Sequence, residues 1–268
     1  MSRSLSTTRI EWGSPLAPPE NAWVRLQLGP LHLWALRARA EWRIATLSVD
    51  EAGGGSAPSD EPPPSAVVTR FGFSNPPLAL RLQPALADRA VIVSPADPFL
   101  LPPREEVELY VSTPVWVVVT LEDKPSEVLL EVSSQRPSDT WFGPSTRVGE
   151  LCYAARTRAR LTLEEVEDRP HRAVAVVRIA NRARTLLTIE RLRLPVPAMS
   201  LYVDGRGRLW TEPVTLARAS DDERASVQLG GVPPAQARGT VRLAEPRNRA
   251  ERGLLERTFG GIIREIRG

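Results

Sequence analysis

Alternation of apolar and polar residues with a period of two runs through most of the chain and constrains its fold more than any other feature. Trp23–Leu28 and Glu106–Ser112 show it, and it is typical of strands with one face on a core. Turn-forming residues separate the runs, and many of the 26 prolines stand near run ends, where they protect sheet edges. The pattern predicts an all-β fold, an antiparallel β-sandwich of the Ig-like or jelly-roll-like kind.

The alternation is interrupted once by a long polar stretch and ends before the last residues, which suggests three segments. Residues 50–65 combine Gly, Ser, Pro and acids, a composition that buries too little apolar area to offset the cost of ordering. We therefore predict an N-terminal β-rich region over residues 1–88 with a flexible loop at 50–65. A β-sandwich domain is expected over 89–245, and a C-terminal helix over 246–268.

The last segment has a helical period. Asn248, followed three residues later by Glu251, matches an N-terminal cap, and four apolar residues then recur at helical spacing: Leu255, Phe259, Ile262 and Ile266. Three interspersed glycines each weaken such a helix by roughly 1 kcal/mol relative to alanine. The stripe must therefore pack against something. Its own domain, a partner protein and a membrane surface are the alternatives.

Bulk composition excludes several classes of protein. The longest apolar stretches, such as Val115–Val119, are far shorter than the roughly 20 residues of a membrane-spanning helix. The first residues lack the apolar core of a secretory signal, so a cytoplasmic location is expected, with peripheral membrane contact left open. The 35 basic and 32 acidic residues are interspersed, which gives little support for a nucleic acid partner.

No constellation of residues indicates catalysis or a metal centre. His32 and His171 are far apart, Cys152 is solitary, and neither an H-x-x-x-H nor a C-x-x-C spacing occurs. His32 is interpreted as a hydrogen-bonded structural residue, and Asp204–Gly207 as a tight reversal between two strands. We expect no catalytic residue, no metal and no cofactor, although an all-carboxylate calcium site stays open.

Three arginines occupy alternate positions at Arg156, Arg158 and Arg160. A strand would place all three guanidinium groups on one face, with the residues between them toward the core. One interpretation is a solvated outer face paired with nearby carboxylates. The other is a binding patch for an anionic partner, namely a phosphate, an acidic protein or a lipid headgroup.

A second candidate segment lies just before this row. Ser138–Ser145 contains Asp139 and the adjacent aromatic residues Trp141 and Phe142, followed by Gly-Pro. An exposed Trp141 would be a recognition anchor, whereas a buried one would plug one end of the sandwich. We include Asp139, Trp141 and Phe142 with the arginines as hypothetical binding residues.

Several of these motifs, taken in order, resemble the signature of a known family. They are Thr140–Pro144, Gly149–Tyr153, Val177–Asn181, Glu190–Pro195 and Ser94–Pro103. Over roughly residues 90–245 the chain is similar to domain of unknown function family 432, an uncharacterised bacterial and archaeal family. The resemblance implies no reaction and no cofactor. It does imply an association with small-conductance mechanosensitive channels.

The sequence thus predicts a non-enzymatic cytoplasmic interaction module, an accessory of a mechanosensitive channel by resemblance. It would bind an anionic or protein partner through its arginine-rich sheet face. The alternative is a carbohydrate- or small-anion-binding domain, or a hydrolase whose carboxylates are dispersed along the chain. A scaffolding subunit that self-associates through the C-terminal helix is a third class.

Overall fold

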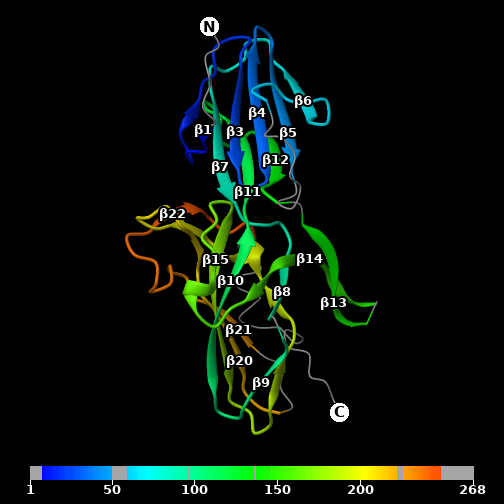
Figure 1. Cartoon of the computed structure of the whole chain (residues 1–268), viewed down its shortest axis with the longest axis vertical. Helices are drawn as coiled ribbons and strands as arrows, with labels where there is room; N and C mark the ends of the chain where they lie inside the picture. Colours follow the sequence, from blue (N-terminus) through cyan, green and yellow to red (C-terminus); the bar gives the residue numbers. More distant parts are fainter. Residues whose placement is uncertain are drawn as a thin grey trace. The chain divides into compact units, whose positions relative to one another are not determined.

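The computed structural model describes residues 8–49, 59–95, 97–135, 137–145, 147–221 and 226–248, and its regular structure is almost entirely strand (Figure 1). Two compact units are formed, one from Met1–Ala85 and Val115–Arg136, the other from Leu86–Pro114 and Pro137–Gly268. The division predicted at 88/89 places Val115–Arg136 with the later residues. In the structure they belong with the first unit because their strands pair with an early one.

The first unit contains two sheets. Its five-stranded sheet has the order β1 (Thr8–Arg9), β3 (Trp23–Leu28), β4 (Leu31–Ala38), β5 (Glu41–Ser48) and β6 (Val67–Gly72). Its four-stranded sheet has the order β12 (Val128–Ser133), β11 (Trp116–Leu121), β7 (Leu80–Ala85) and β2 (Pro15–Leu16). Consecutive strands β3 to β6 pair antiparallel with their neighbours, as the short turns between most of them require.

Strand β4 is buried on both faces, which alternation alone does not predict. Its residues Leu31–Leu36 are all buried, and the Trp34 indole N–H donates to the carbonyl oxygen of Ser59 at 3.1 Å. His32 is buried and shares a hydrogen bond of 3.2 Å with Arg25, in agreement with a structural histidine. Burial, together with the Arg25 charge, lowers the pKa of His32.

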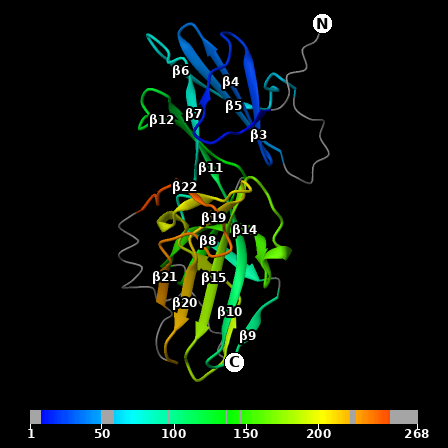
Figure 2. The ribbon, with the colours of Figure 1, turned by 90° about the vertical axis from the view of Figure 1, so that its left-hand side faces the viewer.

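The second unit is built around a seven-stranded sheet (Figure 2). Its order is β21 (Ser226–Leu229), β20 (Val214–Arg218), β15 (Arg172–Asn181), β19 (Leu209–Thr211), β18 (Leu201–Val203) and β22 (Val241–Ala244), with β10 (Glu106–Pro114) also paired to β15. β10 runs antiparallel along the whole of β15. The other edge of β15 is shared by β19 and then β20, both parallel to it.

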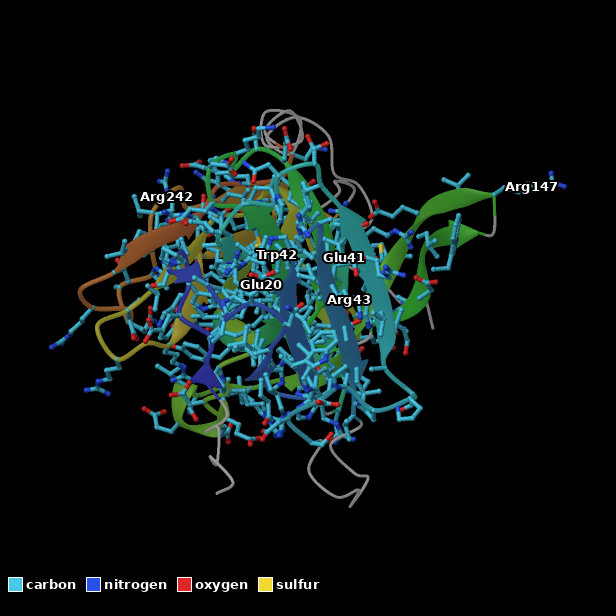
Figure 3. All side chains as sticks on the ribbon, turned by 90° about the horizontal axis from the view of Figure 1, so that it is seen from above. Glu20, Glu41, Trp42, Arg43, Arg147 and Arg242 are labelled. Carbon is cyan, nitrogen blue, oxygen red and sulfur yellow. The ribbon has the colours of Figure 1, made fainter. Side chains whose placement is uncertain are left out.

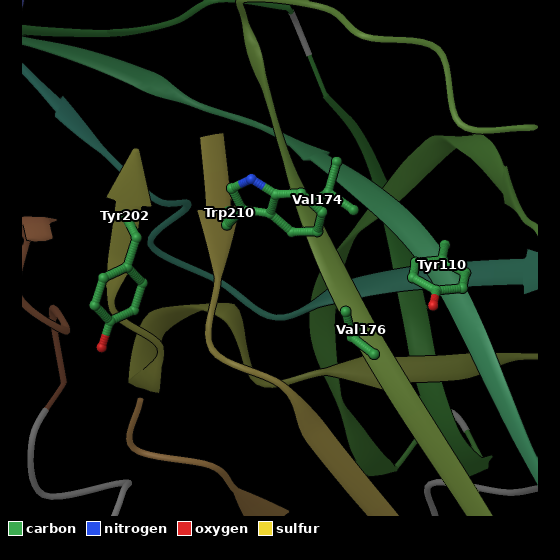
Figure 4. Packing of buried hydrophobic residues seen from close by; sticks show 5 residues of the cluster. All are labelled: Tyr110, Val174, Val176, Tyr202 and Trp210. Carbon is green, nitrogen blue, oxygen red and sulfur yellow. The ribbon is translucent and has the colours of Figure 1, made fainter. Parts of the chain in front are cut away.

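Aromatic residues form a core on one face of this sheet. Tyr110, Val174, Val176, Tyr202 and Trp210 pack together there (Figure 4). The reversal expected at Asp204–Gly207 is present between β18 and β19, with Gly207 at a φ of 86°. The Asp204 carboxylate accepts the Trp210 indole N–H at 2.9 Å, which ties this turn to the core.

Two smaller sheets complete the described part of the second unit. One has the order β13 (Ser138–Ser145), β14 (Val148–Ala159), β8 (Val91–Pro95) and β17 (Leu192–Leu194). The other pairs β16 (Leu187–Ile189) with β9 (Phe99–Leu101). Two single 3₁₀ turns, η1 (Leu163–Glu165) and η2 (Val196–Ala198), lie between strands. The all-β prediction is confirmed, but the sheets are mixed, because β14 also pairs parallel with β8.

Two predicted segments fall largely outside the described residues. The helix predicted for 246–268, with its stripe of Leu255, Phe259, Ile262 and Ile266, receives no support, since only 246–248 of it are described and they are not helical. In the expected flexible loop 50–65, residues 59–65 are described and form bends and turns. Residues 50–58 lie outside the described part.

Candidate functional site

The predicted arginine row lies at the C-terminal end of strand β14, with Arg156 and Arg158 in the strand and Arg160 directly after it. Arg158 and Arg160 are exposed, and Ala159 between them is 7% exposed, so the two arginines share an outer face as alternation predicts. Arg156 occupies the preceding alternate position of the strand. Beyond β14, the backbone N–H and C=O groups of Arg160 exchange hydrogen bonds of 2.9 and 2.8 Å with Tyr110, which joins the row to β10.

This junction contains a pocket of about 290 Å³. It is lined by residues of β10, of the end of β14 and of the segment that includes η1: Tyr110, Ser112, Arg158, Arg160, Glu165, Val166, Glu167 and Arg169. Tyr110 and Ser112 are alternate residues of β10, so both face the pocket from one side of the strand. The lining is mainly polar and contains three arginines against two glutamates.

The side that β10 contributes is held in place by hydrogen bonds. Buried Arg172 donates from Nε to the Ser112 hydroxyl at 2.9 Å and from Nη2 to the Ser112 carbonyl oxygen at 2.7 Å. The Tyr110 hydroxyl donates to Glu108 at 2.5 Å and accepts from Gln236 at 3.1 Å. The pocket therefore has a preformed wall rather than one that a ligand must assemble.

Glu108 and Tyr110 influence each other's protonation. Burial alone would raise the pKa of Glu108, but hydrogen bonds from Tyr110 and Arg178 outweigh it and lower that pKa. Burial and the hydrogen bond to Glu108 raise the pKa of Tyr110. At neutral pH the Glu108 carboxylate is therefore ionised. The Tyr110 phenol keeps its proton and donates a hydrogen bond to Glu108.

The charges in the pocket are unequally paired. Arg169 forms an ion pair with Glu167 at 2.6 Å. Neither Arg158 nor Arg160 has an ion pair or hydrogen bond from its side chain to any residue in the described part of the chain, and the same holds for Glu165. Two exposed guanidinium groups and one carboxylate therefore line a single pocket without pairing to one another.

The other candidate residues lie at the opposite end of β14, in the hairpin that β13 and β14 form. This hairpin extends from the second unit, and Arg147 marks its tip (Figures 1 and 3). Trp141 is 41% exposed and lies opposite Leu151, so it does not plug a sandwich end. Phe142 points to the other face and packs on Ala90, Ile92 and Cys152.

Ion pairs and ring contacts occupy the charged groups of the hairpin. Asp139 pairs with Arg89 at 3.2 Å, and the Arg89 guanidinium lies 5.2 Å from the centre of the Tyr153 ring. Buried Arg193 forms a bidentate pair with Glu150. Asp139, Trp141 and Phe142 are absent from the pocket lining, so the structure does not bring them together with Arg158 and Arg160.

Within the described residues, the remaining candidate chemistries find little support. Cys152 is fully buried, and burial raises the pKa of its thiol to about 12, so the thiolate is scarce at neutral pH. No three His, Cys, Asp or Glu side chains of the described residues gather as metal ligands would. Among the same residues, no helix has the length and apolarity to cross a membrane.

Sequence reasoning missed six of the eight residues that line the pocket. Tyr110 and Ser112 stand in an ordinary alternating strand, and nothing in the sequence says that β10 lies beside the end of β14. The acids of residues 164–168 follow a candidate strand, and in the sequence alone they are typical of a solvated turn. In the structure the segment that contains them closes one side of the pocket. Its acids, set directly after three alternating arginines, were the signal that could have suggested a mixed-charge site.

Fold and site together define an all-β protein with an arginine-lined pocket. The family model described as "Protein of unknown function (DUF432)" matches residues 12–264, and the chain belongs to this family. The match confirms the resemblance that the motifs indicate and extends it over nearly the whole chain. No curated protein and no solved structure matches.

Proposed function

We propose that this protein is a non-enzymatic binding module that holds an anionic group of its partner with Arg158 and Arg160. The observation that carries the proposal is the pair of guanidinium groups on one strand face that line a pocket and lack any partner in the described chain. Arginine side chains bind carboxylate or phosphate oxygens through two parallel N–H···O bonds. Unpaired arginines at a preformed wall can do this without first breaking an internal ion pair.

The alternative of a carbohydrate site has less support. Carbohydrate recognition uses an exposed aromatic face beside polar groups. The aromatic residue of the pocket lining, Tyr110, is only 9% exposed and packs in the core, and the exposed Trp141 lies outside the lining. Glu165 and Glu167 do line the pocket, but Glu167 is engaged by Arg169. A hydrolase that uses two carboxylates would therefore first have to release one of them from its arginine.

The partner itself comes only from the family resemblance. We propose a small-conductance mechanosensitive channel, as that resemblance implies, and a cytoplasmic location for the protein. Purification of the tagged full chain together with the solubilised channel is the measurement, and loss of the complex on charge reversal of Arg158 and Arg160 is the expected result. A complex that survives both substitutions would contradict the arginine face as its contact.

Anion binding itself can be tested without knowing the partner. Inorganic phosphate and sulfate titrated into the full chain should shift the Nε–Hε NMR signals of Arg158 and Arg160 in a saturable way. The double variant Arg158→Gln, Arg160→Gln should lose the response, whereas Arg182→Gln, which alters an exposed arginine outside the pocket lining, should keep it. Absence of a saturable response in the unmodified protein would overturn the proposed function.

A further inference from the structure

We infer that the pocket of Arg158, Arg160 and Glu165 takes a phosphate ester that carries a hydroxyl group next to its phosphate. This inference rests on the proposed function and specifies its ligand. It follows from three properties of the pocket: the spacing of the two arginines, the presence of an unpaired carboxylate, and the volume.

The spacing of the arginines favours a phosphoryl group over a carboxylate. Alternate residues of a strand stand about 7 Å apart, so the two long side chains can converge on one group in the pocket that both line. A carboxylate has one charge and two oxygens, which a single guanidinium satisfies. A phosphate monoester has a charge of about −1.5 to −2 at neutral pH and three terminal oxygens, which match two guanidinium groups.

Glu165 makes a bare phosphate an incomplete ligand. Its carboxylate lines the same pocket, accepts hydrogen bonds only, and repels any anion that the arginines attract. It lies beyond ion-pair distance of both arginines, since neither has such a partner in the described chain. A ligand with a hydroxyl beside its phosphate satisfies both sets of groups, because the hydroxyl donates to Glu165 while the phosphate accepts from the arginines.

The volume limits the size of the ligand. About 290 Å³ lies at the lower end of the range for small-molecule sites. This suits a phosphate with a short polyol better than a larger nucleotide. A phosphate with an adjacent hydroxyl occurs in a free polyol phosphate and in the glycerol phosphate headgroup of a phospholipid. The headgroup phosphate is a diester with a single charge and two terminal oxygens, so it satisfies the two arginines less fully than the free monoester. The experiment has an arm for each source.

Calorimetric titration of the full chain with inorganic phosphate, glycerol 3-phosphate and glycerol tests the inference. A hydrogen bond to a charged group contributes roughly 1.5 to 3 kcal/mol, so glycerol 3-phosphate should bind about tenfold or more tightly than phosphate. Glu165→Gln should reduce this preference and should not weaken phosphate binding. Arg158→Gln should weaken both anions about tenfold or more, and Arg182→Gln should change neither.

Three results separate failure of the inference from failure of the proposed function. Equal affinities for phosphate and glycerol 3-phosphate, both lost in Arg158→Gln, would overturn the inference and leave the proposed function intact. No binding of either anion would overturn both. A preference for glycerol 3-phosphate that survives in Glu165→Gln would also overturn the inference, because the preference would then arise elsewhere.

A vesicle arm identifies the source. If the ligand is a headgroup, the protein should co-sediment with phosphatidylcholine vesicles that contain phosphatidylglycerol and not with vesicles of pure phosphatidylcholine. This co-sedimentation should be reduced in Arg158→Gln and in Glu165→Gln. Binding of soluble glycerol 3-phosphate alone would support the same pocket chemistry with a free ligand. Sedimentation that is unchanged in Glu165→Gln and Arg158→Gln would contradict a headgroup in this pocket.

Discussion

The two ends of strand β14 use arginine in opposite ways. At the hairpin end, arginines from neighbouring elements are already paired within the protein. Arg193 pairs with Glu150, and Arg89 pairs with Asp139 and lies over the Tyr153 ring. At the pocket end, Arg158 and Arg160 have no such partner in the described chain. The difference shows that exposure and arginine content alone do not identify a binding surface. What separates the two ends is whether the charge is already compensated.

The comparison also separates stability from recognition. Removal of the carboxylate that pairs with a buried guanidinium strongly destabilises the folded state, because the uncompensated charge stays out of water. An exposed guanidinium without an internal partner contributes little to folding, so its removal costs little. The hairpin end should therefore respond to substitution mainly through the free energy of unfolding, and the pocket end mainly through binding.

The largest effect is expected for Glu150→Ala. The substitution leaves the Arg193 side chain, 3% exposed, without its bidentate carboxylate. Because the Glu150 side chain is itself 40% exposed, we expect the free energy of unfolding to fall by about 3 kcal/mol, which is the lower end of the range for broken buried ion pairs. Chemical denaturation measures it. The control is Glu127→Ala, which breaks an exposed pair with Lys124 at 3.2 Å and should cost under about 0.5 kcal/mol. Equal losses in both variants would contradict the comparison.

The next effect is expected for Gly143→Ala at the same end. A Cβ at Gly143 would overlap the carbonyl oxygen of Val148 and the Cα of Gly149, both backbone atoms of the facing strand. One at Gly149 would stand 2.6 Å from the Phe142 carbonyl oxygen, so the two glycines let the strands approach closely. Such overpacking costs about 1 to 3 kcal/mol.

Hydrogen exchange locates this loss. Faster exchange should be confined to β13 and the first half of β14, and anion binding at Arg158 should remain. Gly72→Ala is the matched control, because a Cβ there meets no atom within 4 Å. Unchanged exchange in the Gly143→Ala hairpin would show that its backbone can adjust without cost.

How much of this the sequence predicts depends on the range of the interactions involved. Alternation predicts that Arg158 and Arg160 face outward and Ala159 inward, and the glycines predict the reversal at Asp204–Gly207. Both predictions succeed because they depend only on neighbouring residues. The sequence leaves the exposure of Trp141 open, since that exposure depends on what lies across from it. Alternation says nothing about that.

The pocket could not be predicted because it depends on pairings between distant parts of the chain. Tyr110 meets Arg160 through an isolated bridge between residues fifty positions apart, and β15 accepts two parallel neighbours on one edge. Neither register leaves a mark in a single sequence. The placement of β11 beside β7 in the first unit is another long-range pairing of this kind.

A smaller effect is expected at the wall of the pocket from Glu108→Gln. The Glu108 carboxylate accepts from Tyr110, Arg178 and Gln236, and because it is partly exposed we expect a loss of about 1 kcal/mol. Since these hydrogen bonds lower the pKa of Glu108 below its ordinary value of 4.5, its contribution is present at neutral pH. It is lost as the pH falls from the ordinary range through the lower native pKa.

The measurement is the stability difference between the unmodified protein and Glu108→Gln at several pH values. The difference should be constant from pH 7 to about pH 6 and should shrink below about pH 5. A difference that grows on acidification would mean that Glu108 is protonated in the native state, which would contradict the geometry of the wall.

The smallest effect on folding is expected for Arg158→Gln and Arg160→Gln, although these have the largest effect on binding. Neither side chain has an internal partner in the described chain, and both are exposed, so each variant should unfold within about 0.5 kcal/mol of the unmodified protein. Removal of one of these positive charges also reduces its repulsion with Arg169, which lines the same pocket, so the folded state can gain slightly in stability. Denaturation in low and high salt checks this, because screening should remove any gain from reduced repulsion. A loss comparable to that of Glu150→Ala would show that the two ends of β14 do not differ, and that the arginines at the pocket serve the fold.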